Sequence, residues 1–139
     1  MAVETMSLRF ETVGDANIIE LTGETQEAIR QSGIKDGIAT LFVPGSTAGL
    51  TTIEFEQGAV KDFQRLFDEI ANPDRDYAHN ERWGDGNGHS HVRASLLGAS
   101  LTVPFTEGKL LLGQWQQIIF VDFDNRPRSR VVVVQVVGE

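Results

Sequence analysis

The sequence contains no cysteine, which excludes both a disulfide framework and a metal site built from thiolates. A metal ion in this protein would therefore need histidine and carboxylate ligands, and the chain has only 3 histidines. No apolar run reaches the roughly 18 residues that a membrane-spanning helix needs. The N-terminal residues MAVETMSLRF also lack the pattern of a signal peptide, so we expect a cytoplasmic protein with no membrane partner.

Positive charge is scarce as well, since 12 lysine and arginine residues stand against 20 aspartate and glutamate residues. The net charge of −8 argues against general nucleic-acid binding, which depends on clustered positive charge. An anionic ligand would need a local basic pocket.

The composition is otherwise that of an ordinary globular protein, with 40% hydrophobic and 23% charged residues in 139 positions. The chain shows no repeat, no low-complexity segment and no linker. We therefore expect a single compact domain over residues 1–139.

Short elements separated by glycine fill the first half of the chain. Loose alternation of apolar and polar residues around the turn signal GD predicts a β-hairpin over residues 6–21. A helix is expected from residue 22 to Gly33, followed by strands at 37–45 and 50–56.

Helical spacing of large apolar residues marks 58–73, where Asn72 and Pro73 end the pattern. The next segment, 74–88, reads DRDYAHNERWGDGNG and predicts a long irregular loop. Long loops in compact domains often carry function.

The last third of the chain reads mainly as strand. A short helix is expected over 89–98, and a hairpin around the turn TEG at 106–108. The apolar segments 115–124 and 129–137 are predicted to pair with each other and to be buried on both faces. These patterns predict an α+β fold with a mostly antiparallel or mixed sheet and two to three helices.

The histidines are candidate metal ligands or catalytic groups. In an extended segment His89 and His91 would face the same side and could share a divalent ion with His79. In a helix the two would diverge by roughly 200°. The alternative is that one histidine packs or caps while the other lies in solvent.

Glu54 is the one acidic residue between Ile53 and Phe55 in a predicted strand, so it faces the opposite side from both. On a pocket face it would serve as a metal ligand or a general base. The alternative is an exposed strand carboxylate.

Two segments are candidates for phosphate binding. The loop GSTAGLTT offers the hydroxyls of Ser46, Thr47 and Thr51 together with two glycines, although a tight turn explains it equally well. Arg128 and Arg130 point the same way if they lie on a strand, and arginine binds phosphate in a bidentate manner. A solvated turn or an ion pair between subunits would explain these arginines without a ligand.

Four segments carry a family resemblance: FVPGSTAGLTTIEFE, YAH, NGHSHVRASLLGASLTVPF and GKLLLGQWQQIIFVDFDNRPRSR. In order and spacing they resemble the YjbQ family of small proteins. The resemblance implies a compact α+β homotrimer whose pocket is lined by histidines, a glutamate and threonines. His79 and His91 match the pocket histidines best. It also implies a thiamine-phosphate synthase activity, which joins a pyrimidine diphosphate to a thiazole phosphate and releases pyrophosphate.

The chain departs from the family pattern at Gly45, where the resemblance leads one to expect a histidine, as in HTTAGL. We predict that His89 replaces the missing histidine, that it reaches the same ligand as His91, and that Gly45 leaves a gap facing it.

Together these observations predict a small cytoplasmic enzyme that acts on a phosphorylated small molecule. The expected catalytic residues are Glu54, His79 and His91, and the expected phosphate ligands are Ser46, Thr47, Thr51, Arg128 and Arg130. A divalent ion, zinc or magnesium, would be held by His79, His89 and His91. The alternatives are a non-enzymatic trimer that binds a metal or an anion, and a metal-dependent hydrolase with the same ligands.

Overall fold

A computed structural model describes residues 1–139. The chain forms eight strands, arranged in two antiparallel sheets, and four helices. The larger sheet has the strand order β1-β8-β3-β5-β6. Its strands are β1 (Ala2–Thr12), β8 (Arg128–Gly138), β3 (Gly37–Phe42), β5 (Ser100–Thr106) and β6 (Lys109–Leu110).

The smaller sheet has the order β2-β7-β4. Its strands are β2 (Asn17–Glu20), β7 (Gln116–Asp122) and β4 (Ala48–Glu54). The helices are α1 (Thr22–Ser32), α2 (Gln57–Ile70), α3 (Ala78–Trp83) and α4 (Gly88–Leu97). None of them is long and apolar enough to cross a membrane. The α+β prediction is confirmed.

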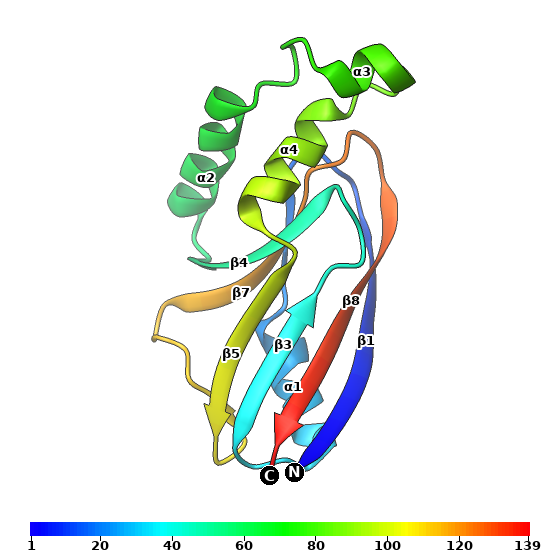
Figure 1. The fold of residues 1–139 in the computed structure, drawn as a ribbon. Helices are drawn as coiled ribbons and strands as arrows, with labels where there is room; N and C mark the ends of the chain where they lie inside the picture. Colours follow the sequence, from blue (N-terminus) through cyan, green and yellow to red (C-terminus); the bar gives the residue numbers. More distant parts are fainter.

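Figure 1 shows how the layers are arranged: the long strands β1, β8, β3 and β5 lie side by side, with α1 behind their lower half and the smaller sheet towards their upper end. Helices α2 and α4 lie above the smaller sheet, and α3 lies beyond them at the top of the molecule. The smaller sheet is therefore enclosed between the larger sheet and a pair of helices.

Strand β7 is the centre of the hydrophobic core. Ile118 and Phe120 belong to the cluster shared with β3, β8 and α1, whereas Ile119 and Val121 belong to the cluster beneath α2 and α4. All four side chains are 0% exposed. The prediction of burial on both faces is confirmed for β7, but it is wrong for β8. There the buried valines alternate with half-buried or exposed residues, because one face of the larger sheet is left uncovered.

Two predicted hairpins do not form. Strand β1 pairs with β8 and β2 pairs with β7, so the predicted hairpin over 6–21 is wrong. Gly14, Asp15 and Ala16 all have positive φ, and this turn carries the chain from one sheet to the other. The predicted pairing of 115–124 with 129–137 is wrong for the same reason, since β7 and β8 lie in different sheets.

The expected hairpin around residues 106–108 is confirmed, with Phe105 opposite Leu110 and Thr106 opposite Lys109, although β6 has only 2 residues. Helix α1 ends as expected at Gly33, which adopts φ 72°. Helix α2 is also confirmed. The Glu56 side chain caps its start by accepting hydrogen bonds from the backbone N–H groups of Gly58 and Ala59.

The segment 74–88, expected to be irregular, contains α3, so that prediction is wrong. Its glycines lie after the sequence AHNERW and not within it, and Gly84 at φ 73° ends the helix. Helix α4 confirms the helical expectation for 89–98, which rules out the extended arrangement of His89 and His91.

Candidate functional site

A cleft of about 570 Å³ lies where the β3–β4 loop, the α3–α4 region and the start of β8 meet. Its lining residues are Gly45, Ser46, Thr47, His79, Trp83, Asp85, Asn87, His91, Asp124, Arg128 and Arg130. Six of these residues were expected from the sequence to bind or transform a ligand: Ser46, Thr47, His79, His91, Arg128 and Arg130.

Two imidazoles face each other in this cleft. His79, at the start of α3, and His91, on α4, have ring centroids 4.4 Å apart, with the ring planes tilted by 41°. The Nδ1 atom of His79 is buried and lies 3.3 Å from Oδ1 of Asp85, in a contact without the direction of a hydrogen bond. This contact leaves Nε2 as the ring nitrogen of His79 that a ligand can reach.

His89 lies elsewhere. Because α4 is helical, its side chain points away from that of His91 into the interior, where it is 4% exposed and 6.3 Å from the ring of Tyr77. Burial lowers the pKa of His89, and the nearby Arg93 lowers it further. His89 does not line the cleft.

The three histidines are therefore not brought together, and no group of three or more histidine, aspartate or glutamate side chains is arranged to hold a metal ion. The predicted gap between Gly45 and His89 is wrong, because Gly45 faces the Arg130 side chain. A Cβ atom at Gly45 would lie 3.4 Å from Nη1 of Arg130.

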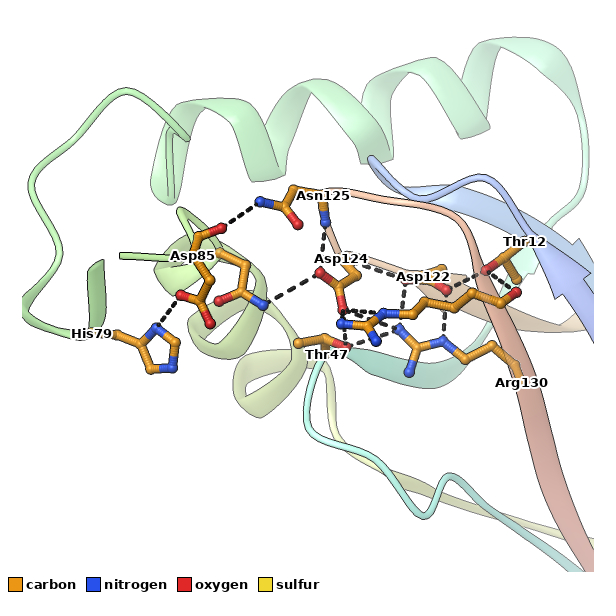
Figure 2. A network of polar contacts seen from close by, with 10 residues as sticks. Thr12, Thr47, His79, Asp85, Asp122, Asp124, Asn125 and Arg130 are labelled. Carbon is orange, nitrogen blue, oxygen red and sulfur yellow. Dashed lines mark hydrogen bonds and ion pairs between the residues drawn. The ribbon is translucent and has the colours of Figure 1, made fainter. Parts of the chain in front are cut away.

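The floor of the cleft is formed by two arginines held by two buried aspartates. Arg130 donates from Nε and Nη2 to the two carboxylate oxygens of Asp122, at 2.7 and 2.8 Å. Arg128 donates from Nε to Asp124 at 2.9 Å. Figure 2 shows these contacts side by side, with His79 and Asp85 across the cleft.

Asp124 has further donors. Its carboxylate accepts hydrogen bonds from the backbone N–H of Asn125, from the amide of Asn87 and from the hydroxyl of Thr47. Burial alone raises the pKa of Asp124, but these hydrogen bonds and the one from Arg128 outweigh it and hold the pKa below its usual value. Asp124 is therefore a fixed negative charge that orients whatever donates to it.

The carboxylates lie beneath the guanidinium groups. Both aspartate residues are 0% exposed, whereas the side chains of Arg130 and Arg128 are 12% and 34% exposed. Nη1 of Arg130 makes no hydrogen bond within the chain. The ligand side of this layer consequently consists of N–H donors, although each positive charge is balanced from below.

The two hydroxyls of the β3–β4 loop differ in their availability. Ser46 is exposed at the rim of the cleft. Thr47 is buried, and its hydroxyl already donates to Asp124 and accepts from Nη2 of Arg130 at 2.8 Å. Thr47 therefore fixes the arginine.

Thr51 and Glu54 do not line the cleft. They lie further along β4, where Thr51 is opposite Ile119 and the exposed Glu54 is opposite Gln116. Glu54 is six residues beyond Ala48, which places it about 20 Å along the strand from the cleft. Within one chain it cannot contact the paired histidines.

Sequence reasoning missed the two aspartates that hold the arginines. Asp122 and Asp124 are two residues apart in an otherwise apolar segment, FVDFD, just as Arg128 and Arg130 are two apart in PRSR. Acidic side chains at this spacing share one face of an extended segment. Because buried carboxylates need cationic or N–H partners, the matched spacings could have suggested the ion pairs.

Comparisons with known proteins agree along nearly the whole chain. A family model described as "UPF0047 protein YjbQ-like" matches residues 6–139. A UPF0047 protein of Methanothermobacter thermautotrophicus is 35% identical over 139 residues, covering 100% of this chain and 95% of the relative. The UPF0047 protein YugU of Bacillus subtilis is 34% identical, covering 95% and 98% of the two chains.

Solved structures give the same result. A YbjQ-like protein from Sulfolobus solfataricus P2 superposes with a TM-score of 0.94 at 33% identity, over 99% of both chains. A structure from Clostridium acetobutylicum superposes with a TM-score of 0.87 at 35% identity, over 95% of this chain and 99% of the other. The names of these relatives state no reaction, so function has to be argued from the cleft.

Proposed function

The chain belongs to the YjbQ-like UPF0047 family, and on that premise we propose that its cleft binds a phosphorylated small molecule and acts on it. One observation supports this most directly: two guanidinium groups fixed by buried carboxylates open onto the same cleft as a pair of imidazoles.

Phosphate fits the floor of the cleft because the N–H donors of the two arginines are already oriented. Arg130 is held by three hydrogen bonds, so little side-chain entropy remains to be lost when an anion binds. Its free Nη1 and the exposed part of Arg128 supply charge-assisted donors for phosphate oxygens. The buried aspartates reduce the net charge but leave the local dipole directed at the ligand.

The imidazoles would supply the chemistry beside the bound phosphate. Nε2 of His79 and the ring of His91 can transfer protons to or from a reacting oxygen, as histidine does in many enzymes. If a divalent ion were bound here, His79 and His91 would be the residues to hold it, and it would supply Lewis-acid activation of the phosphate. Two imidazoles suit zinc better than magnesium, which prefers oxygen ligands.

The family resemblance names one specific reaction, thiamine-phosphate synthesis. In that reaction a C–N bond forms between a pyrimidine diphosphate and a thiazole phosphate, and pyrophosphate leaves with the electrons of the broken C–O bond. Arg128 and Arg130 would stabilise the negative charge that develops on the departing pyrophosphate. Among the phosphorylated substrates that the cleft could accept, this pair is the first to assay.

Calorimetric titration with inorganic pyrophosphate tests the binding proposal. We expect Arg128→Gln to weaken pyrophosphate binding about tenfold or more, since a charge-assisted hydrogen bond is lost. The fold should survive, because Asp124 keeps three other donors. Arg126→Gln is the matched control, as Arg126 is exposed in the same turn and lies outside the cleft. Equal losses in both variants, or no binding to the wild type, would refute the proposal.

Turnover assays separate an enzyme from a binder. With the pyrimidine diphosphate and thiazole phosphate, His91→Ala should reduce the rate by about a hundredfold, far more than it weakens pyrophosphate binding. Pyrophosphate binding without any turnover would indicate instead a non-enzymatic anion-binding protein. Release of inorganic phosphate from either substrate alone would indicate a hydrolase.

A further inference from the structure

A second, smaller cavity adjoins the cleft. Its volume is about 190 Å³, and its lining residues are Gly45, Ser46, Ala48, His91, Ala94, Ser95, Gly98 and Ala99. Gly45, Ser46 and His91 line both spaces. The imidazole of His91 therefore stands at the junction between the two.

The two spaces differ in chemical character. Apart from His91, the smaller cavity is lined by glycine, alanine and serine, with no arginine, lysine or carboxylate. The cleft beside it contains two arginines, two aspartates and His79. A charged group placed in the smaller cavity would lose water without gaining an ionic partner, which is unfavourable.

The cavity also has a definite size. At about 30 Å³ for each water-sized group, 190 Å³ holds about six such groups, which corresponds to a single five- or six-membered ring. The backbones are closely packed next to it: a Cβ atom at Gly49 of β4 would lie 2.8 Å from the carbonyl oxygen of Gly98, which lines the cavity at the end of α4.

We infer that the smaller cavity is a specificity pocket, which accepts a compact uncharged group, of one ring at most, from the same ligand whose phosphate lies against Arg128 and Arg130. This inference rests on the proposed function. It narrows the substrate class to phosphate esters that carry a small uncharged ring or a branched chain close to the phosphate. His91 would then contact the ligand between its two ends.

Ser95 offers a way to fill the pocket without disturbing the core. It is exposed on α4 and lines the smaller cavity but not the cleft. Ser95→Leu adds two heavy atoms to the cavity wall, whereas Ser95→Ala leaves the cavity open and serves as the matched control. Neither variant replaces Arg128, Arg130 or a histidine.

Titrations with inorganic phosphate and phenyl phosphate test the inference. The wild type and Ser95→Ala should bind phenyl phosphate at least about tenfold more tightly than inorganic phosphate, because the ring leaves water. Ser95→Leu should lose that advantage and keep the same affinity for inorganic phosphate.

The other outcomes count against the inference. If inorganic phosphate binds and phenyl phosphate has no advantage in the wild type, the specificity pocket is wrong and the proposed function stands. If Ser95→Leu weakens both ligands equally, the cavity does not discriminate between them. If neither ligand binds to the wild type, the proposed function fails and the inference fails with it.

Discussion

Asp122 and Asp124 are the residues on which the geometry of the cleft depends most. Each is fully buried and is paired with an arginine from the start of β8. Asp122 has one other side-chain donor, the hydroxyl of Thr12, whereas Asp124 has several. The two ion pairs should therefore tolerate the loss of the arginine differently.

We expect Arg130→Leu to destabilise the protein by about 3–5 kcal/mol, because it leaves Asp122 as a buried charge with no cationic partner. Urea denaturation followed by circular dichroism would measure the change. Arg126→Leu should change the free energy of unfolding by no more than about 0.5 kcal/mol, since Arg126 is exposed. An Arg130→Leu variant as stable as the wild type would show that Asp122 needs no cation.

His89 should make stability depend on pH. Its pKa in the folded protein lies below the ordinary 6.5, first because of burial and then because of Arg93, although Asp15, Asp124 and Asp68 oppose this. The unfolded chain therefore binds more protons below about pH 6.5, and the free energy of unfolding falls as the pH is lowered through that value. Well above pH 6.5 both states are neutral at this residue and the effect vanishes.

His89→Gln removes this titration. Thermal unfolding measured from pH 7.5 down to pH 5 should show a smaller loss of stability in the variant than in the wild type. Parallel curves for the two proteins would mean that His89 is protonated as easily in the fold as in the unfolded chain.

Among single residues, the sequence predicted part of the cleft correctly. Ser46, His79, His91, Arg128 and Arg130 do share one space. His89 does not, because a helix turns residues two apart to opposite sides, and Glu54 does not, because β4 carries it away from the loop where the strand begins. These are effects of element type and direction that residue identity alone does not reveal.

Among the elements, all helices except α3 were predictable, as were most strands, whereas most of the strand pairings were not. Helical spacing of apolar residues located α2, apolar runs located β3 and β7, and the stop at Gly33 located α1. Such patterns do not report the partner of a strand. Neighbouring strands in the sequence pair in about two thirds of cases, but here every connection between consecutive strands except the one from β5 to β6 passes from one sheet to the other.

The pairing of β3 with β8 depends on two facing glycines. Gly37 lies opposite Gly138, and a Cβ atom at Gly37 would be 2.0 Å from the carbonyl oxygen of Val137. We expect Gly37→Ala to force these strands apart at that end and to lower the melting temperature by at least about 5 °C, corresponding to about 1 kcal/mol or more.

The control is another glycine in regular structure. A Cβ atom at Gly23 of α1 would meet nothing within 4 Å, so Gly23→Ala should leave the melting temperature unchanged or raise it. Calorimetry on the two variants measures both effects. If Gly37→Ala has the same melting temperature as the wild type, the strands can relax around the added methyl group.

For the whole molecule, the uncovered face of the larger sheet is the main unexplained surface. Ile38 and Phe42 on β3 are 43% and 46% exposed there, and the pairing register places them beside Val137 and Val133 of β8. Figure 1 views the sheet from this side, with α1 on the opposite face. Exposed apolar side chains on this sheet face, in a chain of net charge −8, are suited to contact with another copy of the same chain.

We therefore expect the homotrimer that the family resemblance implies. Light scattering at micromolar concentration should give the mass of three chains of 15.3 kDa, and Phe42→Glu should shift the mass towards that of one chain. A wild-type mass of a single chain at that concentration would rule out the trimer.

The position of the arginine–aspartate layer also bears on how this protein can diversify. The layer joins the end of β7 to the start of β8, which is where the chain passes from the smaller to the larger sheet. A mutation in the arginine–aspartate layer would therefore be selected against as a folding defect before any change in ligand could be favoured. Ser95, in the wall of the smaller cavity, is exposed, so a mutation there should not cause a folding defect. New ligand preferences should thus arise by mutation of the residues that line the smaller cavity, while the arginine–aspartate layer is conserved.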